Sequence, residues 1–178
     1  MIGPVLWESF QKFYNMSAEE ADRANTYFVE AYEKEGIYNA SVYEGVENML
    51  ETLQNAGRIL LVVTAKPRDM AETVLNHTGI DQYFQAVIGP ARGNKKTDKG
   101  SLLKEALSFL AKTGTDHFQK EQAVMVGDRM FDIQGAVETG IRSIGVLYGY
   151  GDRQELIDAG ATLLADTPAV VVKCICRE

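Results

Sequence analysis

Two aspartates, Asp128 and Asp132, follow the short apolar run 123–126 and are the side chains of this sequence best suited to metal chemistry. Asp132 lies four residues after Asp128, which is about one turn if a helix begins here. Two carboxylates stacked in this way can hold a hard divalent cation, one directly and one through water, which suits Mg²⁺. The alternative is that Asp128 caps the helix and Asp132 is a solvated residue of its first turn.

A second polar segment, Thr64-Ala65-Lys66-Pro67, follows the apolar run 59–63. A threonine hydroxyl and the free backbone N–H groups at the start of a helix together form an anion site, because the helix dipole favours negative charge there. We therefore expect Thr64, Ala65 and Lys66 to contact a phosphate group of the substrate. The alternative is that Thr64 is an ordinary helix N-cap.

A third candidate is Lys99, which follows Thr97-Asp98 and opens an apolar helical pattern. Its ammonium group can supply a point charge to a phosphoryl group. Lys95 and Lys96 are close in the chain and are alternatives for the same role. Surface lysines are usually solvated, so the position of Lys99 has meaning only in combination with the other two segments.

The elements that must position these residues change in character along the chain. Up to about residue 36 the pattern is helical throughout, with a capping box at Ser17 and Glu20. After Tyr43, short apolar runs alternate with helical ones, which indicates a parallel sheet covered on both faces. The strands are predicted at 59–63, 86–88, 123–126, 142–146 and 162–164, and the helices at 7–14, 18–34, 45–56, 67–78, 99–111, 130–139, 154–159 and from 168 onwards.

This order predicts an α/β protein with a helical part at residues 1–40 and a sheet-containing core at 41–178. In an open parallel sheet, ligands bind beyond the carboxyl ends of the strands. The segments that begin at Thr64, Lys99 and Asp128 each lie at a junction before a helix. We therefore expect the three segments to meet in one site.

Composition and charge exclude some classes of partner. The 178 residues carry a net charge of −7, which disfavours nucleic acid, because binding to its backbone needs a basic face. No run approaches the roughly 18 apolar residues of a membrane span, and the start of the sequence does not resemble a secretory signal. Cys174 and Cys176 lack the companions of a zinc site. We expect a cytoplasmic protein, monomeric or homodimeric, with no membrane or nucleic-acid partner.

The combination of Thr64, Lys99, Asp128 and Asp132, in this chain order, resembles motifs two, three and four of the haloacid dehalogenase superfamily. The sequence is most similar to the phosphoglycolate-phosphatase-like branch of that superfamily, and the similarity covers essentially the whole chain. The further segments that carry it are Ile2-Gly3-Pro4, Tyr43-Glu44-Gly45-Val46, Ile144-Gly145-Val146, Gly149-Tyr150-Gly151, Gly160-Ala161-Thr162 and Ala165-Asp166-Thr167-Pro168.

The resemblance implies a Rossmann-like core with a partial helical cap, and hydrolysis of a phosphate monoester of a small phosphorylated metabolite with Mg²⁺. It implies that Thr64 and Lys99 hold the phosphoryl oxygens, that Asp128 binds the metal, and that Asp132 orients either the metal's water or the lysine. In the family an aspartate attacks phosphorus, and water then hydrolyses the aspartyl-phosphate.

One family feature is absent from this sequence, because no Asp-x-Asp pair with a following threonine precedes the helical part. From this we expect a core without the family's first strand, and a chain that is inactive or nearly so. Three interpretations stay open: a phosphatase truncated at its N-terminus, a non-catalytic relative that binds phosphate, metal or a protein, and a phospho-receiver domain. The chain order disfavours the receiver, in which the acidic residues come before the threonine and the lysine.

Overall fold

The computed structural model describes residues 6–94, 98–113 and 118–176. Three of the residues discussed above, Lys95, Lys96 and Thr97, lie outside the described residues, as does the segment Ile2-Gly3-Pro4.

The helical part consists of α1 (Leu6–Tyr14) and α2 (Ala18–Lys34), followed by the short 3₁₀ helix η1 (Gly36–Asn39). The predicted capping box is present at the start of α2. The backbone N–H of Ser17 donates to the Glu20 carboxylate at 2.8 Å, and the N–H of Glu20 donates to the Ser17 hydroxyl at 3.3 Å. These two bonds satisfy N–H groups that the first turn of a helix leaves without intrahelical partners.

Strands and helices alternate through the rest of the chain, as predicted. β1 is shorter than the apolar run that predicted it, because its partner β2 offers only three residues and the pairing begins at Leu61 opposite Ala86. The elements are α3 (Val46–Asn55), β1 (Leu61–Val63), α4 (Arg68–Thr78), η2 (Asp81–Tyr83), β2 (Ala86–Ile88), α5 (Lys99–Lys112), η3 (Lys120–Gln122), β3 (Val124–Gly127), α6 (Met130–Thr139), β4 (Arg142–Val146), α7 (Arg153–Asp158), β5 (Leu163–Ala165) and α8 (Pro168–Cys176).

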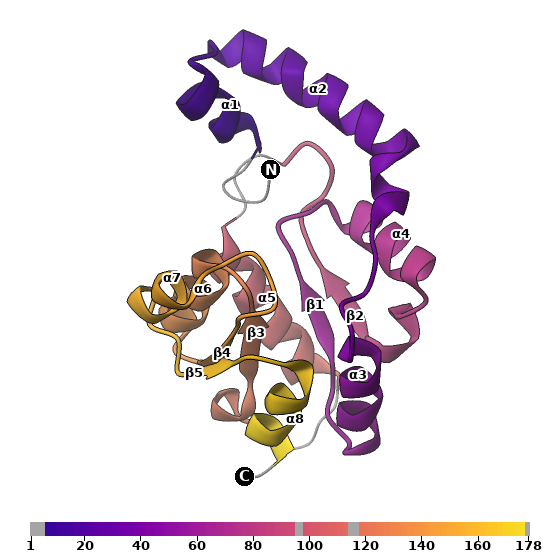
Figure 1. Ribbon diagram of the computed structural model, residues 1–178, viewed down its shortest axis with the longest axis vertical. Helices are drawn as coiled ribbons and strands as arrows, with labels where there is room; N and C mark the ends of the chain where they lie inside the picture. The colour runs from indigo at the N-terminus through magenta and orange to yellow at the C-terminus, as the bar shows by residue number, and fades with distance from the viewer. Residues whose placement is uncertain (1–5, 95–97, 114–117, 177–178) are drawn as a thin grey trace.

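All strand pairings are parallel, but among the described residues they form two sheets. β1 pairs with β2, while β4 lies between β3 and β5. β1 and β3 do not pair with each other in the described chain, although Figure 1 shows them as the facing strands of the two sheets. The α/β class with parallel strands and covering helices is therefore confirmed.

Helices cover both faces of the strands, and three apolar clusters hold the layers together. On one face α3 and α8 pack against β3, β4 and β5 around Leu50, Ile144 and Val171. On the other face α5 and α6 pack around Leu103 and Ala136. This second cluster also contains Met125 of β3, and Val63 of β1 packs against it. Side chains therefore connect the two sheets even though their backbones do not pair.

The helices α1 and α2 lie apart from the sheets and extend over the loops that follow β1 and β2 (Figure 1). Two contacts connect α2 to those loops. The ammonium group of Lys66 donates to the Tyr32 hydroxyl, and Arg92 forms ion pairs with Glu33 of α2 and with Asp69 of α4. The division of the chain at residue 40 stays a prediction. No helix among the described residues is long and apolar enough to cross a membrane.

Candidate functional site

Thr64 lies directly after β1, and its backbone N–H continues the pairing by donating to the carbonyl of Ile88 at 2.9 Å. Its hydroxyl oxygen accepts the backbone N–H of Lys66 at 3.1 Å, which closes a tight turn. Helix α4 begins at Arg68 with Pro67 as its N-cap residue. The alternative in which Thr64 caps the helix is therefore wrong. The Thr64 hydroxyl donates no hydrogen bond to any residue that the structure describes, so its hydrogen can be donated to a ligand.

Lys99 is the first residue of α5, and its side chain contacts the end of β1 and the first turn of α6. Its ammonium nitrogen lies 2.9 Å from the carbonyl oxygen of Val63 and 2.8 Å from Oδ1 of Asp132. The Lys99 and Asp132 side chains are only 14% and 13% exposed, so bulk water weakens their attraction less than it would at the surface. Because Val63 directly precedes Thr64, these contacts place the cation beside the predicted phosphate loop.

Asp132 has a second contact, with the start of its own helix. Its Oδ2 accepts the backbone N–H of Arg129, the N-cap residue of α6, at 3.2 Å. One of its oxygens therefore orients Lys99 and the other fixes the helix start. Of the two arrangements expected for Asp132, the structure shows contact with the lysine.

Asp128 lies between β3 and α6 and is not the helix cap, since that position belongs to Arg129. Its Oδ2 accepts the backbone N–H of Tyr150 at 2.9 Å, and its own carbonyl accepts the N–H of Gly151 at 2.9 Å. Both donors come from the loop after β4. The alternative in which Asp128 is a helix cap is therefore wrong.

Tyrosine rings lie close to Asp128. Tyr43, in the segment between η1 and α3, packs edge-on against Tyr148 with ring centroids 5.9 Å apart. Burial raises the pKa of Tyr43 above its usual 10.0, and the neighbouring Tyr150 and Asp128 raise it further. Burial and the Asp128 charge also raise the pKa of Tyr148. Both phenols are therefore neutral at pH 7.

Two further contacts escaped the sequence analysis. Glu155 of α7 accepts a hydrogen bond from Nε of Arg129 at 2.7 Å and another from the backbone N–H of Met130 at 2.9 Å. The Arg129 bond is the main reason that the pKa of Glu155 lies below its usual 4.5. Residues so far apart in sequence give no local signal of this pairing.

Lys66 turns toward the helical part of the molecule. Its ammonium nitrogen lies 4.4 Å from the centroid of the Tyr32 ring, which itself stacks on Phe28. Ala65, beside Lys66, is exposed. Lys99 contacts Asp132 and the carbonyl of Val63, next to Thr64, while Asp128 contacts the loop after β4. The Lys66 backbone N–H donates to the Thr64 hydroxyl, but the Lys66 ammonium group contacts Tyr32 and none of these four residues in the described part of the chain.

The acidic residues near Lys99 suit a metal only in part. Among the described residues no group of three or more His, Cys, Asp or Glu side chains comes together as a metal cage. Both Asp132 oxygens are engaged, while Oδ1 of Asp128 accepts no hydrogen bond from the described part of the chain. Mg²⁺ usually takes one or two carboxylates and completes its shell with water and substrate phosphate. These residues therefore fit Mg²⁺ that is bound together with a phosphate.

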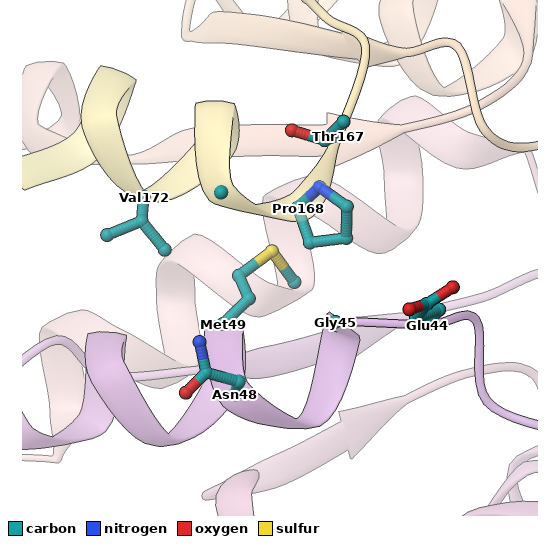
Figure 2. Close-up of a pocket in the computed structure, with 8 residues that line it drawn as sticks. Glu44, Gly45, Asn48, Met49, Thr167, Pro168 and Val172 are labelled. Carbon is teal, nitrogen blue, oxygen red and sulfur yellow. The ribbon is translucent and has the colours of Figure 1, made fainter.

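A pocket of about 380 Å³ lies elsewhere, between the first turns of α3 and α8 (Figure 2). Its apolar wall includes Met49, Pro168 and Val172. None of the predicted site residues lines it. We therefore place the candidate site at the ends of β1 and β3 and not in this pocket.

The chain is similar in sequence to proteins that are named as phosphatases, a nucleotidase and a kinase. The chain is 32% identical over 155 residues to the 5'-nucleotidase of Pseudomonas aeruginosa, covering 87% of this chain and 67% of that protein. It is 32% identical over 172 residues to the tyrosine-protein kinase PtkA of Mycobacterium tuberculosis, covering 96% of this chain and 56% of that protein. It is 31% identical over 176 residues to the phosphoglycolate phosphatase of Vibrio cholerae, covering 98% of this chain and 75% of that protein.

The chain thus spans only slightly more than half of the kinase and about two thirds of the nucleotidase. Among solved structures, a crystal structure of "a predicted phosphatase from Clostridium acetobutylicum" superimposes with a TM-score of 0.89 at 32% identity. The match covers 99% of this chain and 79% of that one. The model of the family described as "Haloacid dehalogenase-like hydrolase" matches residues 1–146. The chain therefore belongs to the haloacid dehalogenase-like hydrolase family.

Proposed function

We propose that Thr64, Lys99, Asp128 and Asp132 form the phosphate- and magnesium-binding part of a phosphate-monoester hydrolase that acts on a small phosphorylated metabolite. The observation that carries the proposal is the position of the Lys99 ammonium group, held between the end of β1 and Asp132. A fixed, poorly exposed cation beside a threonine hydroxyl is suited to the oxygens of a phosphoryl group.

The charge of the chain makes such a local cation necessary. With a net charge of −7, the protein as a whole repels an anionic substrate. Lys99 supplies positive charge where the phosphate would bind, and Thr64 can donate its hydroxyl hydrogen there. When bound, Mg²⁺ would neutralise further phosphoryl charge, with Asp128 as its carboxylate ligand. Asp132 orients the Lys99 ammonium group through their ion pair.

The relatives support the class of substrate. Those named 5'-nucleotidase and phosphoglycolate phosphatase favour a phosphate monoester of a small molecule. Hydrolysis is favoured over the kinase reaction of PtkA because the matching family and the similar crystal structure are both described by hydrolase or phosphatase names. The expected cytoplasmic location, the monomeric or homodimeric state, and the lack of nucleic-acid and membrane partners stay predictions.

A second candidate is a non-catalytic phosphate-binding module, and it rests on one observation. The 178 residues contain no Asp-x-Asp pair. Hydrolysis of phosphate monoesters needs accelerations of up to about 10²¹-fold, whereas one preorganised electrostatic contact contributes roughly 3–4 kcal/mol. The clamp alone cannot supply such an acceleration, so we expect the 178-residue chain to bind phosphate but to turn over substrate near the background rate.

The test combines binding and turnover. Inorganic phosphate is titrated into the chain by calorimetry with and without Mg²⁺, and phosphate release is measured from 2-phosphoglycolate and from a 5'-nucleoside monophosphate. We expect phosphate binding that strengthens with Mg²⁺, and that is lost in Lys99→Ala and loses its Mg²⁺ dependence in Asp128→Asn. Phosphate binding that neither substitution alters would refute the site. Turnover well above background would refute the non-catalytic candidate.

A further inference from the structure

The loop of residues 147–151, which follows β4, lies directly against Asp128. Its backbone makes two hydrogen bonds to this one residue. The N–H of Tyr150 donates to the carboxylate oxygen Oδ2, and the N–H of Gly151 donates to the carbonyl oxygen, both at 2.9 Å. The loop therefore holds both the side chain and the backbone of Asp128.

The two glycines of this loop provide the space for that contact. A Cβ atom at Gly149 would lie within 3.0 Å of Cβ, Cγ and Oδ2 of Asp128, a separation that real Cβ atoms essentially never show. A Cβ atom at Gly151 would collide in the same way with the Asp128 carbonyl oxygen. Neither glycine has a positive φ, so the backbone conformation does not require glycine at either position. Glycine is needed at both positions because the loop backbone lies so close to Asp128 that a Cβ atom would not fit.

The contacts leave Asp128 with one engaged oxygen and one available oxygen. Oδ2 is occupied by the Tyr150 N–H, while Oδ1 accepts no hydrogen bond from the residues that the structure describes. A hydrogen bond from a rigid backbone to one carboxylate oxygen fixes the orientation of the group before a cation arrives. Such preorganisation matters most where few protein ligands hold the metal.

We infer that Gly149, Tyr150 and Gly151 are positioning residues that fix the Asp128 carboxylate for Mg²⁺ through backbone hydrogen bonds and the absence of Cβ atoms. The inference rests on the proposed function, in which Asp128 is the metal ligand. It adds that the loop after β4 sets the metal affinity without touching the metal. The tyrosine side chain has no part in this role, which belongs to the Tyr150 amide.

The first experiment measures Mg²⁺ affinity in the presence of inorganic phosphate for the wild type, Gly149→Ala and Gly151→Ala. Both variants should weaken Mg²⁺ binding by about 10- to 100-fold, the usual effect of disturbing a group that orients a metal ligand. The matched control is Gly57→Ala. Gly57 has a φ of +73° and no atom within 4 Å of the added Cβ, so the substitution strains the fold without adding an atom near Asp128. Its Mg²⁺ affinity should equal that of the wild type.

The second experiment needs no metal. Hydrogen exchange of the Tyr150 amide is followed by NMR in the metal-free wild type and in Asp128→Ala. Removal of the acceptor oxygen should make this amide exchange faster, while helix amides such as that of Ala136 stay protected. Unchanged exchange of the Tyr150 amide would overturn the inference even if the glycine variants failed to fold.

The outcomes separate the inference from the proposed function. If the wild type binds no Mg²⁺ with phosphate, the proposed function is wrong, and the exchange experiment still decides whether the loop holds Asp128. If the wild type binds Mg²⁺ and the folded Gly149→Ala and Gly151→Ala variants bind it equally well, the inference is wrong. A loss of affinity in Gly57→Ala that matches the other two would also overturn it, because general destabilisation would then explain the effect.

Discussion

The ammonium nitrogen of Lys99 lies 2.8 Å from Oδ1 of Asp132, and both side chains are largely shielded from water. Removal of one partner from such a pair leaves the other charge poorly solvated, whereas removal of both leaves no unpaired charge. We expect Asp132→Asn to lower the free energy of unfolding by about 1–3 kcal/mol. The double variant Lys99→Met/Asp132→Asn should lose less than the sum of the two single variants. Urea unfolding of the four proteins measures this coupling, and strictly additive losses would show that the two groups do not interact.

The contact between Lys66 and Tyr32 predicts a role for Lys66 that differs from binding phosphate. The Tyr32 ring is partly buried, and a lysine over an aromatic ring contributes at least roughly 0.5–1 kcal/mol, the range for exposed sites. Lys66→Ala and Tyr32→Ala should therefore weaken the attachment of α2 to the loop after β1, and the segment 36–45 should be cleaved faster by a protease at low concentration. Lys66→Ala should reduce phosphate affinity much less than Lys99→Ala. An equal loss of phosphate affinity in the two lysine variants would support the original prediction from the sequence.

Glu155 predicts an acid-sensitive contribution to stability. Its hydrogen bond with Arg129 lowers the pKa of its carboxyl group below the usual 4.5. A carboxyl group whose pKa is lower in the folded than in the unfolded state stabilises the protein fully when the pH is above the unfolded-state pKa. That stabilisation is lost as the pH falls through the folded-state pKa. The difference in unfolding free energy between wild type and Glu155→Gln should thus be largest above pH 4.5 and shrink below it. A difference that stays constant from pH 7 to pH 3 would contradict this assignment.

The sequence predicted the elements well and the contacts between them only in part. The alternation of apolar runs and helical patterns located β2, α6 and β4 at their observed bounds, because each pattern depends on local periodicity. That Thr64 and Asp128 lie close together, because each follows the end of a strand, stays a prediction. The direction in which Lys66 points could not be predicted, since it depends on Tyr32, which comes from a helix more than thirty residues earlier in the chain.

The role of the loop after β4 was missed for a similar reason. Gly149-Tyr150-Gly151 was visible in the sequence as part of a family resemblance, but its spacing carried no chemistry of its own. The reason for glycine at positions 149 and 151 is seen only in the structure, where the loop packs closely against Asp128. A backbone donor such as the Tyr150 N–H leaves no signal in residue type, because every residue except proline has one.

In the described part of the chain, β1 and β3 each have one edge without a strand partner, which leads to a prediction about association. Within the described chain, β1 has a strand partner only on the side of β2. Thr64 donates its backbone N–H to Ile88 of β2. Because successive residues of a strand direct their backbone N–H and C=O groups to opposite sides, those of Val62 point toward β2 and those of Leu61 and Val63 point away from it. Lys99 satisfies the carbonyl of Val63, but the N–H groups of Leu61 and Val63 have no strand partner in the described chain. An edge of this kind is a template for pairing with another chain.

We therefore expect the 178-residue chain to associate as its concentration rises, and its thermal transition to broaden. Sedimentation velocity over a concentration series measures the association, and residue-resolved hydrogen exchange locates it. In dilute protein the amides of Val62 and Thr64 should be protected while those of Leu61 and Val63 exchange fast, so that alternate residues of one short strand act as internal controls. At high concentration Leu61 and Val63 should gain protection, because a second chain would then occupy the free edge. The prediction is wrong if the chain stays monomeric, melts sharply and protects all four amides. Such a result would mean that β1 is paired on both sides in solution, whereas in the structure β1 pairs only with β2 among the described residues.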